Sequence, residues 1–249
     1  MTDQNTAGPK TVNRRALLKL VGAGAATGAL PLTGAVAADS MHDMQHAAPK
    51  AADPADAPVP VYQFLNGDEA AFMEAIVDTF IPADDVGPGA LELGVATFID
   101  GQLNSGYGRG DRMYLQAPFI EGTPEQGYQL RMTPSELIRN AILDLNAHLR
   151  QTHKTTFDGL ANEDRIAVLK QLEARQIELP TVPTVIFFNL LYDLTMQGYF
   201  ADPLYGGNKG KASWQMIGFP GIGAMYADKI EAFRNKKYMS EPLSIQDLL

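Results

Sequence analysis

Residues 184–199, TVIFFNLLYDLTMQGY, constrain the fold more than any other segment, because a helix formed by them would be apolar on nearly every side. The polar side chains are confined to one narrow stripe, made by Asn189, Asp193 and Gln197 at steps of four residues. A membrane span is disfavoured, since the run is shorter than the ~20 residues needed and carries Asp193 in its middle. We therefore predict a helix buried at the centre of a helical domain.

Two helices are predicted before the middle of the chain. Asn66 is the expected N-cap of the first, which ends at Pro82, and the second is expected over residues 90–103. Their inward-facing residues are expected to be Phe72, Met73, Ile76, Val77 and Phe80 in the first helix, and Leu91, Val95, Phe98 and Ile99 in the second.

Two further helices complete the predicted set. Thr133-Pro134-Ser135-Glu136 is a capping box with proline at the first helical position, so a helix is expected to start there. Its expected buried face is Leu137, Ile138, Ala141, Ile142, Leu145 and Leu149. Another helix is expected over residues 162–175, with Ile166, Leu169 and Leu172 at helical spacing. Without a convincing succession of strands, we predict a mainly α fold: a single compact helical domain with long Gly/Pro-rich loops.

Composition limits the functions open to the chain. Its formal net charge is −9, so it lacks the basic footprint that nucleic-acid binding requires. Cysteine is absent, which excludes disulfides, thiolate ligation of iron–sulfur clusters, a cysteine nucleophile and covalent attachment of c-type haem. Any redox cofactor is therefore expected on another chain.

The N-terminus has the features of an export signal. Arg14 and Arg15 precede an apolar stretch softened by Gly and Ala, and small residues follow at 35–37, AVA. We predict a twin-arginine signal peptide over residues 1–37 and a periplasmic protein that travels bound to a partner. An anchor that is never cut is the alternative, because the apolar stretch is close to spanning length. Residues 22–28 imitate a dinucleotide-binding glycine loop but lack its strand–turn–helix context.

Residues 38–61 are rich in Ala, Pro and Asp, and we predict a disordered tether that leads into a helical domain at residues 62–249. The tether contains thioether and imidazole groups, which are suitable ligands for a soft metal such as copper. They belong to Met41, His42, Met44 and His46. A periplasmic copper-binding module is therefore an alternative function.

Catalytic motifs are missing from the rest of the sequence. There is no G-x-S-x-G elbow and no H-E-x-x-H helix. His148 and His153 are five residues apart and so lie on different faces of a helix, while Asp84 and Asp85 suit a turn. Residues 206–213 fail as a phosphate-binding loop at two positions. We predict no catalytic, cofactor-binding or metal-binding residue on this chain.

Residues 202–221, DPLYGGNKGKASWQMIGFPG, combine five glycines with the one Trp of the chain. Aromatic side chains on a Gly-rich loop are suited to a protein interface, because they supply contact area with few rotatable bonds. We predict partner contacts at Tyr205, Asn208, Trp214 and Phe219. The alternative is that Trp214 and Phe219 fold back into the core. Residues 104–132, rich in Gly, Tyr and Gln, are a second candidate contact segment.

The chain resembles the gluconate 2-dehydrogenase subunit 3 family over roughly residues 62–233. The most specific part is GYFADPLYGGN at residues 198–208, leading into WQMIGFPG at residues 214–221. Residues 64–82, FLNGDEAAFMEAIVDTFIP, and residues 89–103, GALELGVATFIDGQL, also look like the first two helices of the family.

This resemblance implies the small subunit of a three-part, membrane-associated dehydrogenase for gluconate or a related sugar acid or polyol. FAD is expected on a large partner subunit and haem c on a multihaem cytochrome subunit, with no cofactor on this chain. The implied role is non-catalytic: to escort the flavoprotein through the twin-arginine translocase and stabilise it at the outer face of the inner membrane. The family offers no catalytic residues to carry over. A free-standing periplasmic enzyme is a third hypothesis, for which acid–base and nucleophilic residues are sparse.

Overall fold

The computed structural model describes residues 61–120, 122–223 and 226–249. In these ranges the chain forms helices and no β-strand, with two isolated bridges at Asp84–Gly87 and Gly221–Leu243. The α-helices are α2 (Gly67–Phe80), α3 (Val95–Asn104), α4 (Pro134–Thr152), α5 (Asn162–Glu173), α6 (Thr184–Phe200), α7 (Ala212–Ile217) and α8 (Ala227–Ala232). The predicted mainly α fold is confirmed. The predicted signal peptide and nearly all of the predicted tether lie outside the described residues.

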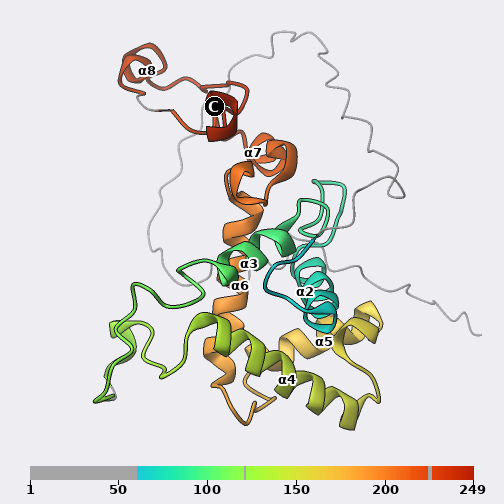
Figure 1. Cartoon of the computed structure of the whole chain (residues 1–249). Helices are drawn as coiled ribbons and strands as arrows, with labels where there is room; N and C mark the ends of the chain where they lie inside the picture. The colour runs from blue at the N-terminus through green and yellow to red at the C-terminus, as the bar shows by residue number, and fades with distance from the viewer. Residues whose placement is uncertain (1–60, 121, 224–225) are drawn as a thin grey trace, which may run out of the picture. The chain divides into compact units, whose positions relative to one another are not determined.

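The predicted central helix is α6, which packs against α2, α3, α4, α5 and α7 (Figure 1). Phe187, Leu191 and Leu194 are fully buried on its inner side. The polar stripe at residues 189, 193 and 197 is exposed, as its spacing predicts. No helix among the described residues is both long enough and apolar enough to cross a bilayer.

The burial of α6 is less complete than the sequence predicts. Phe188 and Tyr192 stack at 6.5 Å beside the polar stripe and are only half-buried. Phe80 of α2 meets both rings edge to face, at 5.8 and 5.9 Å. Neighbouring helices therefore cover the inner side of α6, and the flanks next to the stripe stay partly open to solvent.

The predicted caps and buried faces of α2 and α4 are confirmed. Asn66 accepts a hydrogen bond from the Glu69 amide at 3.0 Å, and the Glu69 carboxylate accepts one from the Asn66 amide at 3.0 Å. Thr133 and Glu136 form the same reciprocal box at the start of α4. All of the residues predicted to face inward from these two helices are buried.

The second helix begins later than predicted, at Val95 instead of residue 90, and Leu91 is exposed instead of buried. The cause is Gly94, whose φ of 77° is left-handed and incompatible with a continuous right-handed helix. A side chain could not replace it, because a Cβ there would lie 2.7 Å from the carbonyl oxygen of Gly206. The helix at residues 162–175 likewise ends slightly early, at Glu173.

One buried carboxylate ties the entry of the chain to α3. Asp100 is 3% exposed and accepts three backbone hydrogen bonds, from the amides of Gln63, Phe64 and Leu65, at 2.8, 2.9 and 2.9 Å. These amides precede the first helix and have no helical partner of their own. The sequence analysis did not single out Asp100, although a lone acidic residue between apolar helix positions indicates such a role.

Arg139 of α4 holds the same segment from another side. Its Nε atom donates to Glu69 at 2.8 Å, and its Nη2 atom donates to the carbonyl oxygen of Phe64 at 3.0 Å. The guanidinium carbon lies 4.2 Å from the centre of the Phe64 ring, within the range of a cation–π contact. Residues 63–66 are therefore fixed to α2, α3 and α4 together.

We expect Asp100→Ala to lower the free energy of unfolding by about 3 kcal/mol, because three backbone amides would lose their charged acceptor. Urea unfolding followed by circular dichroism measures this. Asp85→Ala is the matched control: Asp85 is an exposed acid in a loop, and its loss should cost less than ~0.5 kcal/mol. Equal stability of the two variants would contradict the role assigned to Asp100.

Candidate partner interface

The predicted interface residues lie on and beside the segment that joins α6 to α7, residues 201–211, which we call the α6–α7 loop. Asp202 begins it by accepting a hydrogen bond from the Leu204 amide at 3.0 Å, which caps the short 3₁₀ helix at Pro203–Tyr205. Gly207 then packs directly on the last turn of α6. A Cβ at Gly207 would lie 2.1 Å from the carbonyl oxygen of Gly198, so only glycine allows this approach.

Asn208 is fully buried and organises the loop from inside. It has a left-handed backbone with φ of 46°, and its Nδ2 atom donates to the carbonyl oxygen of Ala201 at 2.9 Å. Its Oδ1 atom accepts from the amide and the hydroxyl of Ser213, at 2.9 and 2.7 Å. Asn208 was predicted as a partner contact, but its side chain is buried and forms its hydrogen bonds with Ala201 and Ser213.

Trp214 is also turned inward. Its side chain is 4% exposed and its indole N–H donates to the carbonyl oxygen of Phe200 at 2.8 Å. Phe219 packs edge to face on the indole, with ring centres 5.2 Å apart, yet it stays 41% exposed. Of the two readings left open by the sequence, folding into the core holds for Trp214, while Phe219 presents part of its ring to solvent.

Tyr205 is the most accessible of the four predicted contacts, with 54% of its surface exposed. Two aliphatic side chains that the sequence analysis did not single out are exposed in the same region, Leu204 beside Tyr205 and Ile217 at the end of α7. The buried pair Asn208 and Trp214 thus forms a rigid base, and apolar side chains project from it. Tyr205 precedes Asn208 in the loop, and Phe219 follows α7.

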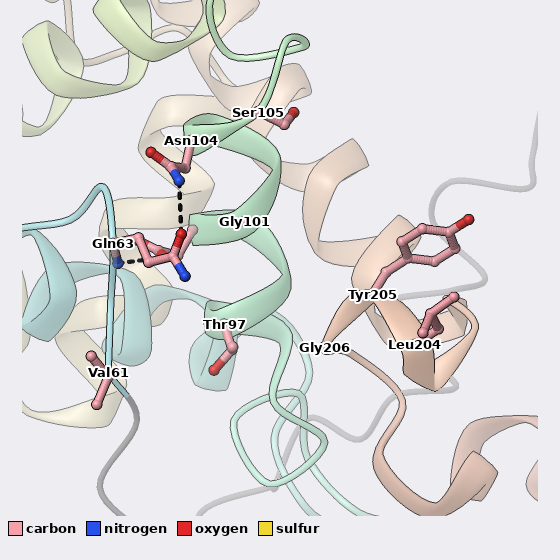
Figure 2. Close-up of a pocket in the computed structure, with 10 residues that line it drawn as sticks. Val61, Gln63, Thr97, Gly101, Asn104, Ser105, Leu204, Tyr205 and Gly206 are labelled. Atoms are coloured by element: carbon pink, nitrogen blue, oxygen red, sulfur yellow. Dashed lines mark hydrogen bonds between the residues drawn. The ribbon is translucent and has the colours of Figure 1, made fainter. Parts of the chain in front are cut away.

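A groove of about 340 Å³ lies between the α6–α7 loop, one face of α3 and the entry segment of the domain (Figure 2). Its lining residues come from all three elements: Val61, Gln63, Thr97, Asp100, Gly101, Asn104, Ser105, Leu204, Tyr205 and Gly206. Asn104 donates to the Gln63 side chain across one wall, at 2.8 Å. The carboxylate of Asp100 already accepts three backbone amides, so the groove offers amides, hydroxyls and apolar surface to a ligand.

The other predicted contact segment, residues 104–132, is anchored at both ends. At one end the amide of Ser135 donates to the carbonyl oxygen of Gly108 at 3.1 Å. At the other end Tyr128 and Met132 pack against the core, and the Tyr128 hydroxyl donates to the carbonyl oxygen of Met132 at 2.7 Å. Burial raises the pKa of Tyr128 well above its ordinary value. Between these anchors Tyr114 and Ile120 are more than four-fifths exposed, so the middle of the segment presents apolar groups to solvent.

The C-terminal residues are fastened to the α6–α7 loop by a hydrogen bond and an ion pair. The amide of Ile245 donates to the second oxygen of Asp202 at 2.7 Å, and Lys211 forms an ion pair with Asp247 at 2.8 Å. Hydrogen bonds from Lys211 and from Ser244 lower the pKa of Asp247 from 3.8 to about 2. This fastening was not predicted from the sequence, because it joins residues far apart in the chain.

Asp84 and His153 are among the other candidate residues that the sequence analysis considered. Asp84 forms a turn by accepting from the Val86 amide at 2.9 Å, as predicted. His153 is exposed at the end of α4, 2.8 Å from the Thr152 hydroxyl. No group of three or more His, Cys, Asp or Glu side chains that could hold a metal occurs in the described part of the chain. Arg14 and Arg15, and the proposed copper ligands at residues 41–46, lie outside it, so both hypotheses stay predictions.

The family model described as gluconate 2-dehydrogenase subunit 3 matches residues 67–221. The match begins at the first residue of α2 and ends just beyond Phe219, so it includes the α6–α7 loop and most of the groove. No curated protein matches the chain. No solved structure matches it either.

We expect Gly207→Ala to lower the free energy of unfolding by about 1–3 kcal/mol, the usual cost of overpacking, because the backbone of α6 would have to move. Gly101→Ala is the matched control. It also lies beside the groove, but a Cβ there meets nothing within 4 Å, so better helix propensity should raise stability by ~0.5–1 kcal/mol. Thermal unfolding of the two variants distinguishes the cases, and a neutral Gly207→Ala would contradict the close contact.

The C-terminal fastening should resist mild acid. Because the pKa of Asp247 is lower in the folded chain, its contribution to stability is complete above about pH 4 and is lost as the pH falls through about 2. Carbon NMR of the Asp247 carboxyl group should therefore show a midpoint near 2. In Lys211→Ala the midpoint should move up towards 3.8, since the first cause of the shift is removed. A midpoint near 4 in the unaltered chain would contradict the ion pair.

Proposed function

We propose that this chain, which belongs to the gluconate 2-dehydrogenase subunit 3 family, is the small, non-catalytic subunit of an FAD-dependent dehydrogenase for gluconate or a related sugar acid or polyol. In this proposal FAD belongs to a large partner subunit and haem c to a multihaem cytochrome subunit. The small subunit supports the assembly, stability and twin-arginine export of the flavoprotein. The complex acts at the outer face of the inner membrane, towards the periplasm.

The observation that carries the proposal is the construction of the α6–α7 loop. Two buried side chains, Asn208 and Trp214, form their hydrogen bonds with groups of the chain itself: backbone groups and the Ser213 hydroxyl. Phe219 packs on the Trp214 indole, Tyr205 lies in the loop that Asn208 closes, and both rings remain exposed. Rigid aromatic side chains on a preorganised base are typical of binding hot spots, because little conformational entropy is lost on association.

The groove beside Tyr205 supports the same role. Its size and its mixture of apolar and amide groups suit an extended segment of a partner chain, laid between α3 and the α6–α7 loop. The entry segment on its far wall is fixed by Asp100 and Arg139, so the groove is bordered by rigid elements. We propose that the flavoprotein subunit occupies it.

The first experiment is to tag the C-terminus, where Leu249 is 92% exposed, and to recover the chain from gently solubilised membranes. We expect flavin and haem c absorption bands and two larger chains by mass spectrometry. A colourless, solitary chain, recovered alone even after crosslinking, would contradict the proposal. Oxidation of gluconate by the isolated chain with a dye acceptor would contradict its non-catalytic part.

The interface is tested by Tyr205→Ala in the same preparation. We expect about thirtyfold weaker association with the flavin-containing partner, the effect of losing ~2 kcal/mol at a hot spot, with unchanged thermal stability of the free chain. Leu143→Ala is the matched control, because Leu143 is exposed to a similar degree on α4. Gly101→Leu should block the groove and weaken association as well. Full recovery of the partner with both Tyr205→Ala and Gly101→Leu would place the interface elsewhere.

A further inference from the structure

Residues 226–242 form an arm that stands apart from the core. Of its described residues only Pro242, at the base, is buried, and the buried core has its last members in α6 and outer packing that ends at Met216. The base of the arm is closed by backbone hydrogen bonds from Ile222 to Leu243 at 2.7 Å and from Leu243 to Pro220 at 3.1 Å. The family match ends at residue 221, at this base, so the role of the matched region does not account for the arm.

The tip of the arm is the turn FRNKKY at residues 233–238. Phe233 and Tyr238 close it with an edge-to-face contact of 4.8 Å, and the Lys236 amide donates to the carbonyl oxygen of Phe233 at 2.8 Å. Tyr226 supports Tyr238 from behind at 6.3 Å and donates its hydroxyl to the carbonyl oxygen of Gly221 at 2.9 Å. The aromatic contacts thus hold a defined turn at a distance from the core.

The tip is basic in an otherwise acidic chain. Arg234, Lys236 and Lys237 are exposed on the turn, and no acidic residue lies between Phe233 and Tyr238. Arg234 also pairs with Glu231 of α8. The tip from Phe233 to Tyr238 carries three basic side chains and no acidic one, a charge of +3, whereas the whole arm carries four basic and three acidic side chains, a charge of +1, in a chain whose net charge is −9. An anionic surface would therefore attract the tip of the arm and repel most of the rest of the chain.

Apolar side chains flank these cations. Ile230 on α8 and Met239 after the turn are each 62% exposed. Cations on long flexible stems, beside single apolar and aromatic side chains, match the boundary of a bilayer, where phosphate groups meet acyl chains. A protein partner would more typically be met by a packed, concave or flat surface than by a narrow turn with isolated apolar groups.

We propose that the arm docks this chain directly on an anionic lipid surface. Arg234, Lys236 and Lys237 contact lipid phosphates, and Ile230 and Met239 enter the boundary between headgroups and acyl chains. The inference is independent of the dehydrogenase assembly, because it needs only the arm. Combined with that assembly, it would give the complex a second attachment to the membrane besides any anchor on a partner subunit.

The test is co-sedimentation with phosphatidylcholine vesicles in which about one third of the lipid is phosphatidylglycerol, the anionic lipid that supplies the surface charge. The protein is the chain without residues 1–37, which keeps every described residue and removes an apolar segment that would itself bind lipid. Arg234→Gln, Lys236→Gln and Lys237→Gln are combined in one variant. We expect at least roughly tenfold weaker partition, since each basic residue near an anionic surface contributes about fivefold.

The matched control combines Arg150→Gln, Lys170→Gln and Arg175→Gln, three exposed cations on or next to α4 and α5, and so makes the same change in net charge. It should bind as the unaltered chain does. A second variant, Ile230→Gln with Met239→Gln, should lose the part of the binding that persists in high salt. Equal binding to neutral vesicles, unchanged binding of the arm variant, or an equal loss in the control would overturn the proposal. If the variant with the three arm cations replaced lost a protein partner but still bound vesicles, the arm would be assigned to protein recognition instead.

Discussion

A helix that carries apolar side chains on almost every side can be stable in water only when other elements cover it, and α6 imposes this requirement on the fold. Phe187, Leu191 and Leu194 are fully buried by helices that come from every part of the described chain before α6. At the other end of α6, Gly198 and Gly207 bring the following loop into backbone contact with its last turn. The position of the candidate interface is thus a direct consequence of how α6 is covered.

Buried polar groups define the geometry around this apolar centre. Asp100 satisfies three amides of the entry segment, Asn208 satisfies the α6–α7 loop, and Asp202 serves both that loop and the C-terminal residues. A buried polar side chain is stable only when its partners are in place, so each one selects a single arrangement of the backbone that surrounds it. No buried side-chain nitrogen or oxygen in the described part of the chain is left without a hydrogen bond.

The surface that results divides into two parts with different chemistry. The α6–α7 loop and the groove present aromatic, aliphatic and amide groups on rigid supports, which suits recognition of a protein segment. The arm presents cations and isolated apolar side chains on a narrow turn, which suits an anionic lipid surface. A subunit with both features would connect a partner protein to a membrane.

Local signals in the sequence determined the helices: the reciprocal caps at Asn66 and Thr133, the apolar stripes of α2 and α4, and the polar stripe of α6 all depend on residues within one or two turns of each other. Contacts between distant residues decided the rest. Gly94 delays α3 because its backbone lies against Gly206, and Trp214 turns inward because the carbonyl oxygen of Phe200 is free to accept its N–H. Composition marked residues 202–221 as unusual, but the tertiary structure alone separated the buried base, Asn208 and Trp214, from the exposed Tyr205 and Phe219, since burial depends on what packs above a residue and not on its type.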